Sequence, residues 1–246
     1  MDYYEQSNDY STDDSSSSNN SSIITNEPNC NCDAYGSCQY CYGDEIDYWN
    51  SCKTFDDLRQ VMLLFIQGKI YKTPMHFGPI VEKDPTYIQH LVKLNEIGAI
   101  SFDGQEYLKT ERVTTTFMQR EYISFYYQLK PSQNLNDIIT KLIEAKVYYV
   151  IFDFNTEKTY IEPSLGKLSF KNNEVWVTKT LNHNTGLFDN HTHMGVAPYD
   201  ESALSVFSQY VQNLQENLLS FIVWSKTWNK PKDGKYLVEN MVKCLE

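Results

Sequence analysis

Apolar residues recur at intervals of three and four along several stretches of the chain, which is the spacing of one helix face. The stretch "TFDDLRQVMLLFIQG" (54–68) predicts a helix in which Thr54 is the N-cap and Asp57 completes a capping box. The stretch "DPTYIQHLVKLNEIG" (84–98) predicts a second helix, with Asp84 as its N-cap. In both stretches a glycine follows the last apolar position, as at many helix ends.

The same periodicity predicts a helix at 134–146 and a last helix at about 235–244. The longest predicted helix is "DESALSVFSQYVQNLQENLLSFIVWSKTW" (200–228). Its apolar residues repeat at three and four positions: Leu204, Phe207, Val211, Leu214, Leu218 and Phe221.

Stretches rich in β-branched and aromatic residues predict strands between these helices. The stretch at 113–129 is long enough for a bend or two elements. The predicted strands are "AISF" (99–102), "VTTTFMQREYISFYYQL" (113–129), "VYYVIFDF" (147–154), "YIEP" (160–163) and "EVWVTKTL" (174–181). The order of elements predicts one α+β domain, in which amphipathic helices pack on a mixed, mostly antiparallel sheet.

Charge is distributed unevenly along the chain. Ten of the 32 acidic residues lie in residues 1–47, which contain no Lys, Arg or His, so the rest holds 22 acidic and 21 basic residues. Residues 1–29 are acidic and rich in Ser and Asn, and are too polar to bury a core, which predicts a disordered tail. We therefore expect this tail, a Cys-rich linker at 30–47, and the α+β domain at 48–246.

Composition also limits the class of function. A nearly neutral domain without a basic stripe argues against nucleic-acid binding. No apolar run approaches the roughly 20 residues that cross a membrane. The first residues, "MDYYEQSNDY", lack the basic and apolar regions of a signal peptide. We therefore expect a soluble intracellular protein, in which thiols stay reduced.

Four of the six cysteines lie in "CNCDAYGSCQYC", at Cys30, Cys32, Cys38 and Cys41. A C-x2-C pair can present two thiolates to one Zn²⁺, and a second pair would complete a tetrahedral site. The other pair here is C-x-C, which fits a zinc site less well. Disulfides in an oxidising setting, such as an assembled virion, and free thiols on a flexible segment are the alternatives.

Residues 49–129 carry a resemblance to a known family. A Trp is followed by a "TFDDL" helix start, a Gly-Pro loop before an acidic residue, "LVKLNEIGAISFDGQE", and a "QR" pair. This pattern resembles a family of uncharacterised proteins that are common in actinobacteria. The matching positions are Trp49, Leu58, Pro74, Gly78, Pro79, Glu82, Leu94, Asn95, Gly98, Gln105, Gln119 and Arg120. The resemblance implies a fold but no activity.

The composition of the whole chain, rich in Asn, Tyr, Ile and Lys, resembles that of proteins from AT-rich genomes, such as those of large DNA viruses of amoebae.

Polar residues within this resemblance could form a site. Arg120 could hold a carboxylate or phosphate through two parallel hydrogen bonds. Glu82 or His76 could act as a base, and Gln105 could line the same pocket. The structural alternative is that Asn95, Asp103, Gln119 and the others brace turns and buried backbone groups.

A second candidate lies in "NHNTGLFDNHTHMG" (182–195). His191 and His193 would point to one face of an extended segment, as two metal ligands should, with His183 and Asp189 nearby. A polar loop without a metal is the alternative.

Taken together, these features predict a non-catalytic interaction or structural protein of the host cytoplasm or the virion, with a protein partner and no cofactor. The first alternative is a small hydrolase or transferase that acts on an anionic small molecule around Arg120. The second is a zinc-stabilised binding module that uses the four cysteines.

Overall fold

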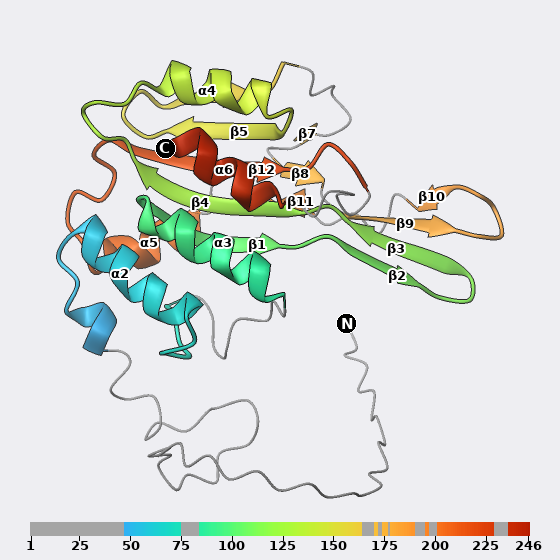
Figure 1. The fold of residues 1–246 in the computed structure, drawn as a ribbon, viewed down its shortest axis with the longest axis horizontal. Helices are drawn as coiled ribbons and strands as arrows, with labels where there is room; N and C mark the ends of the chain where they lie inside the picture. Colours follow the sequence, from blue (N-terminus) through green and yellow to red (C-terminus); the bar gives the residue numbers. More distant parts are fainter. Residues whose placement is uncertain are drawn as a thin grey trace, which may run out of the picture. The chain divides into compact units, whose positions relative to one another are not determined.

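The computed structural model describes residues 47–74, 84–163, 170–171, 174–176, 178–189, 195–196, 201–228 and 236–246. Helices and antiparallel sheets occur together in this part of the chain, which confirms the predicted α+β class (Figure 1). The helices are α2 (Phe55–Ile66), α3 (Pro85–Glu96), α4 (Leu135–Glu144), α5 (Glu201–Ser208) and α6 (Leu237–Leu245).

The strands form three sheets, and every pairing between the described strands is antiparallel. The central sheet has five strands in the order β1-β4-β12-β5-β6, and the two smaller sheets have the orders β10-β9-β3-β2 and β11-β8-β7. The strands are β1 (Ala99–Gln105), β2 (Leu108–Glu111), β3 (Thr115–Gln119), β4 (Tyr122–Gln128), β5 (Tyr148–Asp153), β6 (Lys158–Ile161), β7 (Phe170–Lys171), β8 (Glu174–Trp176), β9 (Thr178–Asn182), β10 (Phe188–Asp189), β11 (Gly195–Val196) and β12 (Leu218–Trp224).

The main core lies between the central sheet and its helices. Helices α3, α4 and α6 cover one face of this sheet, and α6 packs against both α3 and α4 (Figure 1). Because side chains alternate along a strand, Ile123 and Phe125 of β4 face these helices, whereas Tyr122 and Tyr126 face the other side. On that other side, the ring edge of Tyr126 contacts Phe207 of α5, with ring centroids 6.2 Å apart.

The predicted helix starts are confirmed in atomic detail. Before α2, Thr54 accepts a hydrogen bond from the Asp57 backbone, and the Asp57 carboxylate accepts one from the Thr54 N–H, which completes the capping box. Before α3, the Asp84 carboxylate accepts from Thr86 N at 2.9 Å. These caps satisfy N–H groups that the first helical turn leaves without partners.

The predicted helix at 200–228 is wrong. Only Glu201–Ser208 is helical, and Leu218–Trp224 forms β12, in the middle of the central sheet. Between them, Asn213 and Asn217 adopt positive φ values of 56° and 54°, which a right-handed helix does not allow. All seven residues of β12 are buried. A strand covered on both faces reads as a continuous apolar run, which periodicity cannot distinguish from a buried helix.

Two other predicted strands are divided. The stretch at 113–129 forms β3 and β4, as its length suggested, and the two strands belong to different sheets. The stretch at 174–181 forms β8 and β9, which also belong to different sheets.

Several sequence-based predictions concern residues outside the described part of the chain. These are the tail at 1–29, almost all of the Cys-rich linker at 30–47, and the segment with His191 and His193. No helix among the described residues is both long enough and apolar enough to cross a membrane.

Candidate functional site

Arg120 and Glu121 lie where the chain passes from one sheet to another. The pairing of β2 with β3 continues that of β1 with β4, because Gln105 lies opposite Tyr122 and Leu108 lies opposite Gln119. Two further segments meet the chain here, because Thr178 of β9 pairs with Gln119 and the Ser225 N–H donates to the Glu121 carbonyl at 2.9 Å. These contacts therefore bring the start of β9 and the end of β12 close to Arg120.

The Arg120 guanidinium lies against aromatic rings. Its Cζ is 4.0 Å from the centroid of the Trp228 ring and 5.7 Å from that of Tyr148. Tyr148 in turn contacts Trp224, with ring centroids 5.5 Å apart, and so joins a small apolar cluster of Tyr122, Val150, Ile222 and Trp224. The aromatic faces attract the cation, and the apolar cluster keeps water away from one side of it.

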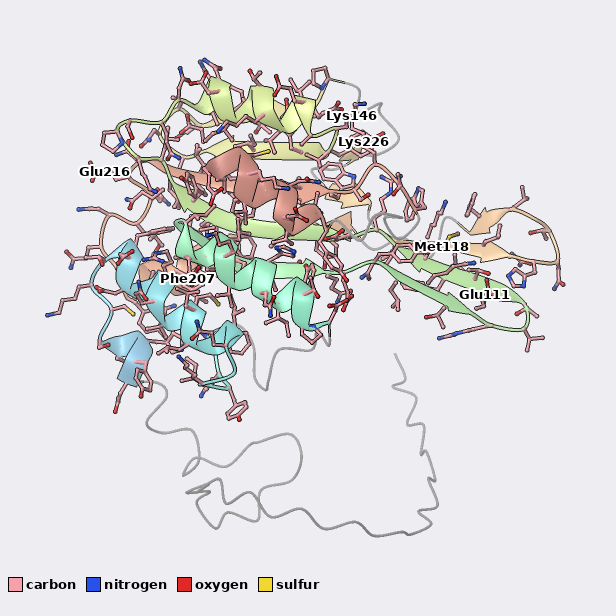
Figure 2. All side chains as sticks on the ribbon, in the orientation of Figure 1. Glu111, Met118, Lys146, Phe207, Glu216 and Lys226 are labelled. Atoms are coloured by element: carbon pink, nitrogen blue, oxygen red, sulfur yellow. The ribbon has the colours of Figure 1, made fainter. Side chains whose placement is uncertain are left out.

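Two lysines complete this group. Lys179 Nζ is 4.2 Å from the Trp228 ring centroid, and Lys226 Nζ is 4.8 Å from that of Tyr148. Lys226 also pairs with the buried Glu162 carboxylate at 2.9 Å. Lys226 lies at the end of the central sheet that adjoins the four-stranded sheet (Figure 2). We call Arg120, Tyr148, Lys179, Lys226 and Trp228 the cation–aromatic cluster.

The charge on Arg120 is not balanced within the described residues. Arg120 is 9% exposed, and its Nε and Nη1 atoms are buried without a hydrogen-bond partner among them. Burial lowers the pKa of Arg120 to about 10. Burial, and then the positive charge of Arg120, also lowers the pKa of Lys179. Because two buried guanidinium nitrogens without acceptors are unfavourable, this arrangement suits an anionic group that would accept from Arg120.

Glu121 faces the other side of the sheet. Its Oε1 accepts a hydrogen bond of 2.7 Å from Leu237 N, at the start of α6. Burial raises the pKa of Glu121 to about 7, although hydrogen bonds from the Leu237 and Val238 backbone act in the opposite direction. Glu121 therefore anchors a helix and does not neutralise Arg120.

The other polar residues of the resemblance are placed separately. Asn95 has a bracing role, because its side chain donates to Leu91 O and Ser101 Oγ and accepts from Ser101 N. The Gln119 side chain donates to Glu106 O at 3.2 Å. Asp103 accepts from the Tyr122 hydroxyl.

Of the candidate site residues, Arg120 lies in the cation–aromatic cluster, and Gln105 is exposed at the end of β1. His76, Glu82 and the four cysteines Cys30, Cys32, Cys38 and Cys41 lie outside the described residues. Within the described residues, no group of three or more His, Cys, Asp or Glu side chains is placed to hold a metal ion. The zinc site and the pocket around Glu82 stay predictions.

The sequence alone does not single out Lys179, Lys226, Trp228 or Glu121 as site residues. The stretch "WSKTW" (224–228) is predicted as part of a helix, whereas β12 ends at Trp224 and the bends that follow bring Lys226 to the Tyr148 ring and Trp228 to Arg120. A signal for Glu121 was available, because it is a lone acid directly before the apolar run "YISFYY".

No family model matches the chain, and a search of curated proteins finds no match. The resemblance in residues 49–129 therefore stays a prediction from the sequence.

Proposed function

We propose that the protein is a non-catalytic interaction protein, and that Arg120 binds a carboxylate of an acidic segment in a partner protein. The observation that supports this most directly is that Arg120 is buried with two guanidinium nitrogens that lack partners among the described residues. A role in binding would offset the free-energy cost of burying such a group.

The surroundings of Arg120 suit binding. Trp228 and Tyr148 lie against the guanidinium, and such ring contacts help to hold its planar fork of N–H groups in place for a carboxylate. Lys179 adds a second positive charge beside the same indole ring. Aromatic residues and arginine are also the residue types that contribute most at protein–protein interfaces.

A protein partner fits better than a nucleic acid. Three cations lie in the cation–aromatic cluster, and Lys226 is already paired with Glu162. Nucleic-acid binding depends on many phosphate contacts along a basic surface. With 22 acidic and 21 basic residues beyond position 47, the domain has no net positive charge to supply them.

The test is the binding of a fluorescent hexaglutamate peptide, measured by anisotropy at low salt. We expect Arg120→Met to weaken binding by about tenfold or more, since a charge-assisted hydrogen bond contributes about 1.5–3 kcal/mol. Arg112→Met is the matched control, because Arg112 is exposed, and should change affinity little. Equal binding by wild type and Arg120→Met would contradict the proposal.

The enzyme alternative has a distinct expectation. A hydrolase or transferase would use His76 or Glu82 as a base beside Arg120, so His76→Ala or Glu82→Gln would abolish turnover of a small anionic substrate. In the non-catalytic proposal, neither substitution changes hexaglutamate binding by more than a few-fold. The binding-module alternative instead requires Cys38 and Cys41 to hold zinc, which metal analysis of the doubly Ser-substituted protein would reveal.

The proposed setting rests on the sequence alone. The Asn-, Tyr-, Ile- and Lys-rich style, which resembles that of proteins from AT-rich viral genomes, supports a viral protein in the host cytoplasm or the virion. Mass spectrometry of purified virions would test this placement.

A further inference from the structure

Strand β2 (Leu108–Glu111) is the outer strand of the sheet β10-β9-β3-β2, and its four residues are all exposed. Figure 1 shows β2 on the far side of β3 from β9, beyond the helices of the central sheet. Glu111 on β2 and Met118 on the neighbouring β3 can be followed in Figure 2. The outer edge of β2 is thus accessible to another strand.

The hydrogen bonds between β2 and β3 show which backbone N–H and C=O groups of β2 point away from the sheet and could pair with another strand. Arg112 N donates to Thr115 O at 2.8 Å, so the backbone groups of residue 112 point toward β3. In an antiparallel ladder this direction alternates from one residue to the next. Leu108 and Thr110 therefore also bond to β3, whereas the N–H and C=O groups of Lys109 and Glu111 point outward.

We propose that β2 pairs antiparallel with β2 of a second copy of this chain, about a two-fold axis at Thr110. Lys109 of each copy then lies opposite Glu111 of the other, and the outward backbone groups of these residues form the ladder. Figure 2 shows Glu111 on the outermost strand of this sheet, where such a pairing would form. The interface is isologous, as in most homodimers.

Charge selects this register over its neighbours. Because only residues 109 and 111 offer outward groups, the two-fold axis could also lie at Lys109 or at Glu111. Those registers would place two lysines or two glutamates directly opposite each other, which is unfavourable. The register centred on Thr110 instead creates two Lys–Glu pairs. Within one copy, Lys109 Nζ already lies 2.6 Å from Glu111 Oε1, so the four groups would alternate in sign.

Val113, which is 97% exposed, lies in the turn between β2 and β3 that the hydrogen bond from Arg112 N to Thr115 O closes, so the ladder ends before it. Charged residues on an edge strand usually discourage pairing. Here the alternating charges of Lys109 and Glu111 favour one partner, which is the antiparallel β2 strand of a second copy.

The interface is small, because each copy contributes a strand of four residues. Such an area falls below the roughly 1,200 Å² of stable complexes, so we expect a weak and reversible dimer.

Sedimentation velocity on the full chain, up to about 200 µM at low salt, tests the proposal in the range where such weak dimers form. We expect a concentration-dependent dimer in the wild type. Lys109→Glu alone and Glu111→Lys alone should each weaken self-association by about tenfold, since each places like charges opposite one another at two symmetric positions. An equimolar mixture of the two variants should associate again, because every opposing pair then has opposite charges.

Lys158→Glu is the matched control, since Lys158 is an exposed lysine on β6, an edge strand of the central sheet. It should leave the dimer unchanged. Circular dichroism checks that each variant is folded. A wild type that stays monomeric, or single variants that dimerise as the wild type does, would overturn the proposal. A mixture that fails to associate would overturn the Thr110 register. None of these outcomes depends on Arg120.

Discussion

Arg120 and Glu121 are neighbours in the chain, carry opposite charges and are both buried, with 9% and 2% of their surface exposed. Their surroundings nevertheless differ. The Glu121 carboxylate accepts a hydrogen bond from the start of α6, whereas the Arg120 guanidinium faces the rings of Trp228 and Tyr148. An extended backbone directs consecutive side chains to opposite faces, which is why the two charges do not pair.

A buried charged side chain can therefore have different effects on stability, depending on whether hydrogen-bond partners surround it. Glu121 satisfies backbone N–H groups, so its burial stabilises the packing of α6. Arg120 has no such role among the described residues, so we expect its burial to destabilise the protein, a cost that the proposed binding would offset. Substitutions at the two positions should therefore change stability in opposite directions.

The largest expected effect is at Glu121. Glu121→Ala leaves the Leu237 N–H buried without an acceptor and should lower the free energy of unfolding by about 3 kcal/mol. Urea unfolding at pH 6 measures this change. Glu121→Gln retains an acceptor oxygen and should lose less than half as much. If the alanine variant were as stable as the wild type, Glu121 would not be the anchor of α6.

The second effect is a pH dependence. Burial raises the pKa of Glu121 to about 7 in the folded protein, above its ordinary value of 4.5. The folded state therefore binds more protons than the unfolded state between these values, so its stability falls as the pH rises from about 4.5 through 7. We expect a loss of about 3 kcal/mol across this window, since each pKa unit corresponds to about 1.4 kcal/mol.

Thermal unfolding from pH 4.5 to 8 measures this loss. It should disappear in Glu121→Gln, which has no proton to release. Asp57 and Asp84 do not interfere, because their hydrogen bonds lower their pKa values and they titrate below this window. A wild-type slope that persisted in the glutamine variant would assign the titration to another group.

The third effect has the opposite sign. Arg120→Met should raise the free energy of unfolding by about 1 kcal/mol, because methionine fills similar space without a buried charge. The matched control is Arg59→Met. Arg59 is also mostly buried, but it donates to Asn95 O and pairs with Asp56, so its loss should destabilise the protein. A destabilised Arg120→Met variant would indicate a structural role for Arg120.

The smallest effect concerns the contact between Arg120 and Trp228. A double-mutant cycle with Arg120→Met and Trp228→Leu should give a coupling energy of about 0.5–1 kcal/mol, as for other cation–aromatic pairs. The same cycle with Trp224, which the guanidinium does not contact, should give none. A coupling near zero for Trp228 would mean that the ring does not hold Arg120.

The sequence predicted those parts of the fold that depend on local signals. Thr54 with Asp57 and Asp84 marked the starts of α2 and α3, because a cap and its helix are formed by residues a few positions apart. It failed at β12, since no local signal shows that Leu218–Trp224 is inserted between β4 and β5. That arrangement depends on partners far away along the chain.

The candidate site follows the same division. Arg120 was named through the resemblance, but Lys179, Lys226 and Trp228 reach it only through the pairing of β9 and the insertion of β12. A misassigned strand therefore concealed most of the cluster. The surroundings of Arg120 could therefore be predicted only if Leu218–Trp224 was first known to be a strand.

The position of β12 also affects how the protein forms during synthesis. A ribosome releases β4 and β5 well before Leu218–Trp224, and those two strands flank β12 without pairing with each other. Until β12 emerges, each of them has an open edge. The nascent chain is then exposed to intermolecular strand pairing, and long-range closure of the sheet makes folding slow. A chain stopped before residue 218 should accordingly aggregate or require a chaperone.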